Sequence, residues 1–168
     1  METSTRSLRA VAKQAHAWFV FAASAVQSPL LLIVRLYWGA QLAQNGWGKL
    51  HNLANVTEFF SGLGVPAPGA TAVFVACFEL VGGILLAAGL LSRIAALGIA
   101  VDMLVAYLTA DRQALLSFFS DPGKFYGADP YTFLCAGLLI LAFGPGRFSL
   151  DAMLGRRIGL QERRHDLR

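Results

Sequence analysis

Four long apolar stretches are the feature that most limits how this chain of 168 residues can fold. They cover about residues 29–50, 68–91, 93–110 and 130–144. A helix that crosses the hydrocarbon core of a bilayer needs roughly 20 apolar residues, and hydrophobic residues make up 56% of the chain against 14% charged ones. The sequence therefore predicts an all-α membrane protein, with a bundle of four transmembrane helices in residues 29–146.

Proline, serine and glycine mark the ends of these stretches. Pro29 takes the first helical position after Ser28, a residue type that caps helix N-termini well. Ser92 separates the second stretch from the third, so the two must form a tight helical hairpin. The fourth stretch ends at FGPGR (143–147), where glycine and proline stop a helix. These signals predict where each helix begins or ends.

Residues 1–28 form a segment of another kind, in which apolar and polar residues recur at helical spacing. Its apolar face holds Leu8, Val11, Ala12, Ala15, Trp18, Phe19, Ala22 and Val26, and its polar face holds Arg9, Lys13, His16, Ser24 and Gln27. We predict a cytoplasmic amphipathic helix that lies in the membrane interface. The alternative is a secretory signal with a cleavage site near Ala23-Ser24-Ala25. Cleavage would place the mature amino terminus outside the cell.

The distribution of Lys and Arg predicts the orientation of the bundle. With both termini in the cytoplasm, ten of the 14 Lys and Arg residues fall inside, Lys49, Arg112 and Lys124 fall outside, and Arg35 lies within the first span. This positive-inside bias argues against cleavage and predicts a multi-pass protein of a bacterial-type cytoplasmic (inner) membrane. Residues 147–168 then form a basic cytoplasmic tail. The basic residues lack the interleaved aromatic surface of nucleic-acid binding, so we expect no nucleic-acid partner.

Three ionisable side chains fall well inside the apolar stretches: Arg35, Glu79 and Asp102. Each costs roughly 2.5–3.5 kcal/mol near the centre of a membrane helix, so such residues face the bundle interior and find partners. Their depths along the helices let an extended Arg35 reach either acid. We expect a buried polar cluster in which Arg35 pairs with Glu79 and one of the two carboxylates keeps a proton. Proton transfer and the fixing of helix register are both compatible with such a cluster.

The outer half of the first stretch, YWGAQLAQNGWGKL (37–50), is unusually polar for a membrane helix. We predict that it lines a ligand cavity open to the outer side, with Trp38, Gln41, Asn45 and Lys49 as lining residues. Small residues also recur near the ionisable ones, where they let neighbouring backbones approach closely. The expected helix-packing positions are Gly39, Gly82, Gly83 and Gly98.

Ligands for metals and redox cofactors are scarce. The three histidines, His16, His51 and His165, lie outside the four predicted spans, so a haem inside the bundle has no pair of histidine ligands. The two cysteines, Cys77 and Cys135, are too few for an iron–sulfur cluster and form no CxxC pair. We predict no metal site. A quinone is the one cofactor that the polar cluster could serve, because a quinone needs hydrogen-bonding groups and protons.

Arg35 and four short segments share a pattern with a known family. The segments are GWGKL (46–50), GLGVP (62–66), FELVGGILLAAGLLSRIAA (78–96) and FGPGRFSLD (143–151). Together they resemble the DoxX family of small four-helix integral membrane proteins. The resemblance implies a four-helix bundle with polar family positions at Arg35, Lys49, Glu79 and Arg93. It also implies a place in thiol, oxidative-stress or quinone-linked membrane systems, without assigning a catalytic residue.

Three functions follow as hypotheses. The favoured one is a non-catalytic subunit or anchor of a redox-linked membrane complex, because no complete catalytic constellation can be assembled from the sequence. The second is a quinone-binding oxidoreductase subunit, in which Glu79 or Asp102 transfers protons. The third is an assembly or trafficking partner, or a carrier of a small solute or lipid, without a redox role. The expected partners are the lipid bilayer, a redox protein and a second copy of the chain.

Overall fold

A computed structural model describes the backbone of residues 2–165 and the side chains of residues 13–157 apart from Ala15. Over this part of the chain the structure is all-helical and contains no strand. The helices are α1 (Glu2–His51), α2 (Leu53–Gly62), α3 (Pro68–Ala88), α4 (Ser92–Thr109), α5 (Arg112–Leu116), α6 (Pro122–Gly127), α7 (Pro130–Phe143) and α8 (Leu150–His165). The predicted all-α class is confirmed.

Three of the described helices are long and apolar enough to cross a membrane. They are α3, α4 and the part of α1 from His16 to His51. Helix α7 is apolar but has 14 residues, which span about 21 Å against a hydrocarbon core of roughly 30 Å. The structure therefore supports a membrane protein with three candidate spans, and the fourth transmembrane helix stays a prediction.

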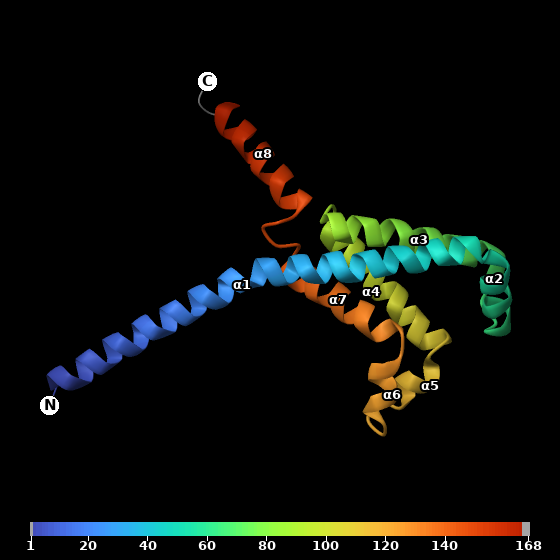
Figure 1. Cartoon of the computed structure of the whole chain (residues 1–168), viewed down its shortest axis with the longest axis horizontal. Coiled ribbons are helices and arrows are strands. Elements are labelled where there is room, and N and C mark those ends of the chain that lie inside the picture. Colours follow the sequence, from blue (N-terminus) through green and yellow to red (C-terminus); the bar gives the residue numbers. More distant parts are fainter. Residues whose placement is uncertain (1, 166–168) are drawn as a thin grey trace.

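The helices pack in two main pairs, α1 with α3 and α4 with α7 (Figure 1). A tight turn joins α3 to α4, and α7 also contacts α1, so the pairs form one bundle. The buried core lies between them and contains Leu42, Leu86, Ile99, Met103 and Ile140. Because lipid surrounds such a bundle, the outward faces of α3 and α4 are apolar as well, as expected for helices in a bilayer.

Helix α1 passes through Pro29 without a break, whereas the sequence predicted a helix start at Ser28-Pro29. A proline removes one hydrogen bond inside a helix. The alanines before Pro29 and the leucines after it favour the helix, so the helix continues through the proline. The segment before Pro29 extends away from the bundle in Figure 1. Its interfacial position stays a prediction, and the side chains of residues 1–12 lie outside the described part.

Glycine lets the backbones of α1 and α3 approach each other closely. A Cβ added to Gly39 would lie 2.8 Å from the backbone of Gly83, and one added to Gly83 would lie 2.5 Å from the backbone nitrogen of Ala43. Gly46, which the sequence analysis did not single out, is closer still to the backbone of Leu80. These positions have no room for a methyl group, so the helices can pack this way only with glycine.

The other two expected packing glycines face α3–α4 contacts. A Cβ on Gly82 would make an ordinary contact with Ile99 at 3.7 Å. A Cβ on Gly98 would clash with the ring of Phe78 at 2.7 Å. Gly98 therefore makes room for an aromatic side chain, and Gly82 is not needed for close approach.

The adjacent glycines of α3 give a matched test of this packing. Gly83→Ala is expected to lower the free energy of unfolding by about 1–3 kcal/mol, because the new methyl group meets backbone that cannot yield. Gly82→Ala is expected to change it by less than about 1 kcal/mol, since the site has room and alanine favours the helix. Denaturation in mild detergent measures both values. Equal losses in the two variants would contradict the close α1–α3 approach.

Candidate functional site

A cavity of about 1030 Å³ lies at the end of the bundle where α1 meets α2. Helices α1, α2, α3, α4 and the start of α7 all contribute to its wall. Its polar lining includes Asn45, Lys49, Glu79 and Asp102. Apolar side chains cover much of the remaining wall, among them Val56, Phe59, Phe60, Val75 and Phe133. The cavity can therefore surround an apolar body and offer polar atoms to one end of it.

Helix α2 forms one side of the cavity because the chain turns sharply after α1. The Asn52 side chain donates a hydrogen bond to the Gly48 carbonyl oxygen at 3.0 Å, which steadies the turn. Helix α2 then places Val56, Phe59 and Phe60 along the cavity. An extended loop follows, in which the Thr71 hydroxyl donates to the Pro66 carbonyl oxygen at 2.9 Å.

An ion pair between α1 and α3 forms the polar part of the cavity wall. Lys49 Nζ donates to Glu79 Oε1 at 2.5 Å. The Glu79 side chain is 5% exposed and the Lys49 side chain 33%. Lys49 lies one helical turn after Gly46, and Glu79 one turn before Gly83. The close glycine packing of α1 on α3 therefore brings the base to the acid.

Two carboxylate oxygens beside this pair have no hydrogen-bond partner among the described residues. They are Glu79 Oε2 and Asp102 Oδ2, and both atoms are buried. A buried acceptor without a donor costs free energy, because water no longer supplies its hydrogen bond. Both residues line the cavity. The two acids of the site therefore each have one oxygen that accepts no hydrogen bond from the described residues.

The polar cluster expected from the sequence is divided in the structure, and the expected pairing of Arg35 with Glu79 is wrong. Glu79 pairs with Lys49, and Asp102 lies beside them at the cavity. Arg35 is also buried, but its Nη2 donates to the Phe148 carbonyl oxygen at 2.6 Å. Depth along a helix indicated which side chains could meet, but the chain after α7 folds back and supplies Arg35 with another partner.

Arg35 belongs to a second polar site at the opposite end of the bundle, which we call the terminal clamp: Arg35, Gly89, Ser92, Phe148 and Asp151. The Asp151 carboxylate accepts hydrogen bonds from the backbone N–H groups of Leu91 and Ser92, at 2.8 and 2.9 Å. Asp151 therefore caps α4 from outside that helix. Gly89, with φ of 72°, ends α3 where a Cβ would coincide with the Arg35 guanidinium.

The clamp also affects the ionisation of Asp151, which lies outside the candidate spans. Burial raises the pKa of Asp151, but the hydrogen bonds from Ser92 and Leu91 and the charge of Arg35 outweigh burial and hold this pKa below its ordinary value. The carboxylate is therefore ionised at neutral pH. It joins α8 to the turn between α3 and α4, so part of the predicted tail is packed against the bundle.

Of the four residues predicted to line a cavity, two do so. Asn45 and Lys49 line it, whereas Trp38 and Gln41 are not among its lining residues. Trp38 packs edge-on against Phe133, with ring centroids 5.8 Å apart. The sequence analysis did not assign α2, Asp111 and Asp129 to the site. The only signal for α2 was the amphipathic run VTEFF (56–60), and nothing in the sequence placed the two acids near Glu79.

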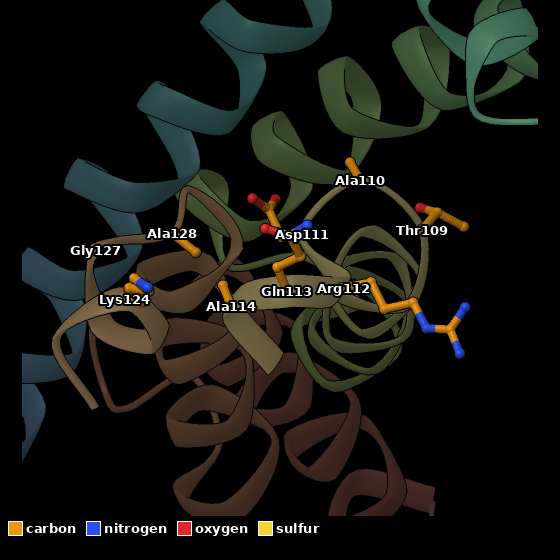
Figure 2. Close-up of a pocket in the computed structure, with 9 residues that line it drawn as sticks. All are labelled: Thr109, Ala110, Asp111, Arg112, Gln113, Ala114, Lys124, Gly127 and Ala128. Carbon is orange, nitrogen blue, oxygen red and sulfur yellow. The ribbon is translucent and has the colours of Figure 1, made fainter. Parts of the chain in front are cut away.

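A shallower hollow of about 720 Å³ adjoins the cavity at the end of α4 (Figure 2). The two share Thr109, Ala110 and Asp111 as lining residues. In Figure 2 the Arg112 side chain extends away from the Asp111 carboxylate. Burial and the nearby charge of Asp129 raise the pKa of Asp111 above its ordinary value. Asp111 and Asp129 both line the cavity and place two carboxyl groups at its mouth.

The unpartnered atoms do not match an oxidised quinone, the cofactor that the sequence resemblance implies. The ring carbonyls of a quinone accept hydrogen bonds, and Glu79 Oε2 and Asp102 Oδ2 are themselves acceptors when ionised. If the two acids keep one proton between them, a quinone can satisfy only the protonated one. The other carboxylate oxygen stays without a donor, so we derive no reaction step through a quinone.

Removing Lys49 tests whether the ion pair holds the bundle together. Lys49→Met is expected to lower the free energy of unfolding by about 3 kcal/mol at pH 8, because it leaves a buried carboxylate without its partner. The double variant Lys49→Met/Glu79→Gln is expected to lose less, since no unpaired charge is left. Chemical denaturation in detergent measures both.

Lys124→Met is the matched control, because Lys124 pairs with Asp121 at 3.6 Å on the exposed surface. Loss of that pair is expected to change the free energy by less than about 1 kcal/mol. If the double variant loses as much free energy as Lys49→Met or more, the two side chains are not coupled and the ion pair is wrong.

Most of the helices that form the cavity lie in the region that matches a known family. Residues 30–112 match the family model described as DoxX. The uncharacterized membrane protein Rv3486 of Mycobacterium tuberculosis is 32% identical over 109 residues, which cover 58% of this chain and 64% of that protein. The inner membrane protein YqjF of Escherichia coli is 27% identical over 133 residues, which cover 76% of this chain and 93% of that protein.

The chain thus spans less than two thirds of the length of the first relative. No solved structure gives a significant match. The family match begins at Leu30 in α1 and ends at Arg112, just after α4. It contains the glycines, Lys49, Glu79 and Asp102. This region of the chain is therefore similar to the DoxX family and to two membrane proteins.

Proposed function

We propose that this DoxX-like protein is a non-catalytic membrane subunit that holds a small amphipathic molecule in the cavity beside Lys49 and Glu79. The observation that carries the proposal is a buried ion pair in the wall of a cavity of about 1030 Å³. Ligand sites in proteins are typically apolar hollows with a few polar groups that orient the ligand. An apolar body fits against the aromatic side chains, and its polar end fits near Glu79 and Asp102.

A holding role agrees better with this geometry than a catalytic one. Lys49 already donates a hydrogen bond to one oxygen of Glu79. Glu79 is therefore paired with a base when no ligand is present. A general acid or base needs a proton that it can exchange with the substrate. The pair therefore favours binding over proton transfer. The family resemblance supports a redox-linked complex as the setting, with this chain as its subunit or anchor.

The orientation of the cavity follows from the distribution of basic residues. The positive-inside rule supports both termini in the cytoplasm of a bacterial-type inner membrane. In that orientation the turn at Asn52 and the mouth near Asp111 face the outside. The ligand then reaches the cavity from the outer side of the membrane, and the terminal clamp lies at the cytoplasmic end.

An anchoring or assembly role is a second candidate, favoured by the first part of α1. Trp18, Phe19 and Phe21 are exposed there, between 66% and 72%, on a segment that extends from the bundle (Figure 1). Aromatic and basic residues on one helix are typical of segments at a membrane interface. This segment can anchor the protein beside a partner without any ligand.

Filling the cavity tests the ligand-holding role. A Cβ added to Gly48 or to Gly155 would meet no atom within 4 Å, but only Gly48 lines the cavity. Purification in native lipid discs followed by mass spectrometry is expected to find a small molecule with the wild type. Gly48→Leu is expected to lose it because the side chain occupies its space, and the matched control Gly155→Leu is expected to keep it.

A wild-type protein that carries no small molecule, or a Gly48→Leu variant that carries as much as the wild type, would contradict this role. The same preparation can test orientation with a cysteine in place of Asn55, an exposed residue at the cavity. That cysteine should react with a membrane-impermeant maleimide in intact cells. Reaction only after the cells are opened would reverse the proposed orientation.

A further inference from the structure

The charges around the cavity are strongly unbalanced. Glu79, Asp102, Asp111 and Asp129 all line it, and Lys49 is the single basic residue among the lining residues. The adjoining hollow adds the basic residues Arg112 and Lys124, but neither lines the cavity itself. Arg112 extends away from Asp111 in Figure 2, and Lys124 pairs with Asp121 on the surface. Even if one acid keeps a proton, the cavity has a net negative charge.

Two carboxylate oxygens of the acids that line the cavity have no hydrogen-bond donor among the described residues. Glu79 is 4% exposed, lines the cavity and has one oxygen bound to Lys49 and the other without a partner. Asp102 Oδ2 is buried and unpartnered in the same region. An ionised carboxylate accepts hydrogen bonds, so a group that donates them completes the site. A positively charged donor also offsets the excess negative charge, which a neutral donor does not.

The apolar part of the cavity narrows the class of cation. A metal ion prefers several oxygen ligands around it. The side chains of Val56, Phe60 and Phe133 provide none. An organic ammonium group binds carboxylates through its N–H groups, and its apolar body can cover these side chains. Aromatic rings near such a cation stabilise it further. The walls therefore fit an organic cation better than an inorganic one.

We propose that the cavity binds an organic cation, namely an ammonium group with N–H donors on an apolar body. The ammonium group donates to the carboxylates of Glu79 and Asp102, which line the cavity, and the body lies against Phe60 and Phe133. The acids at the mouth, Asp111 and Asp129, attract the cation from the outer side. This inference rests on the proposed function, since it names the class of molecule that the cavity holds.

A series of matched probes tests the inference with the wild-type protein in discs of zwitterionic lipid. The probes are 4-phenylbutylammonium, the neutral 4-phenyl-1-butanol and the anionic 4-phenylbutyrate. Binding is measured by equilibrium dialysis, and discs without protein correct for partition into lipid. The ammonium probe is expected to bind at least about tenfold more tightly than the alcohol, because only it forms charge-assisted hydrogen bonds with both acids. The carboxylate is expected to bind more weakly than the alcohol.

Asp102→Asn tests the position of the ammonium group without breaking the Lys49–Glu79 pair. This variant is expected to weaken the binding of the ammonium probe about tenfold. The binding of the alcohol is expected to change by less than about threefold. Asp121→Asn is the matched control, since Asp121 lines neither the cavity nor the hollow, and it should bind all three probes as the wild type does.

The outcomes separate this inference from the proposed function. If the alcohol or the carboxylate binds as tightly as the ammonium probe, the cavity is a ligand site but the cation inference is wrong. If no probe binds to the wild type and purification yields no small molecule, both are wrong. If Asp102→Asn unfolds, the comparison of the three probes on the wild type still decides the question.

Discussion

The ion pair between Lys49 and Glu79 is the interaction on which the rest of this structure depends. A carboxylate inside an apolar bundle is costly unless a base and hydrogen bonds compensate for lost water. Lys49 provides the base at 2.5 Å, but only because α1 and α3 pack backbone to backbone at Gly46 and Gly83. The acid, the base and the glycines are therefore one unit, and the cavity lies beside it.

The two ends of the bundle differ in structure. At one end, the terminal clamp ties α1, the α3–α4 turn and α8 together through Arg35 and Asp151. At the other end, α2 and the start of α7 leave room for a ligand.

The segments that carry the family resemblance divide between these ends. GWGKL (46–50) contains Gly46 and Lys49, and the start of FELVGGILLAAGLLSRIAA (78–96) contains Glu79 and Gly83. The end of that segment and FGPGRFSLD (143–151) form the clamp, with Gly89, Ser92 and Asp151. A physical reason thus exists for these three segments. They provide close packing, charge compensation, a left-handed turn at Gly89 and a cap for α4.

Sequence reasoning found what depends on local composition. The apolar runs gave the helices, and the cost of a charge in a bilayer showed that Glu79 needs a partner. The choice of Arg35 failed because depth along a helix says nothing about the direction of a side chain or about a loop that folds back after α7. Lys49 was expected at the cavity but not as the partner of Glu79. Asp111 and Asp129 were missed because their approach depends on how the connections after α4 fold.

The most direct test of the account is the distance between Lys49 and Glu79 in a lipid bilayer. Solid-state NMR can measure the dipolar coupling between the ¹⁵N-labelled amino group of lysine and the ¹³C-labelled carboxyl carbon of glutamate, with Lys49→Met to assign the signal. We expect a clear coupling, because Lys49 Nζ lies 2.5 Å from Glu79 Oε1 and the carboxyl carbon is one bond further away. A spectrum in which the Glu79 carboxyl carbon couples to no lysine nitrogen would contradict the ion pair, and with it the proposed ligand site.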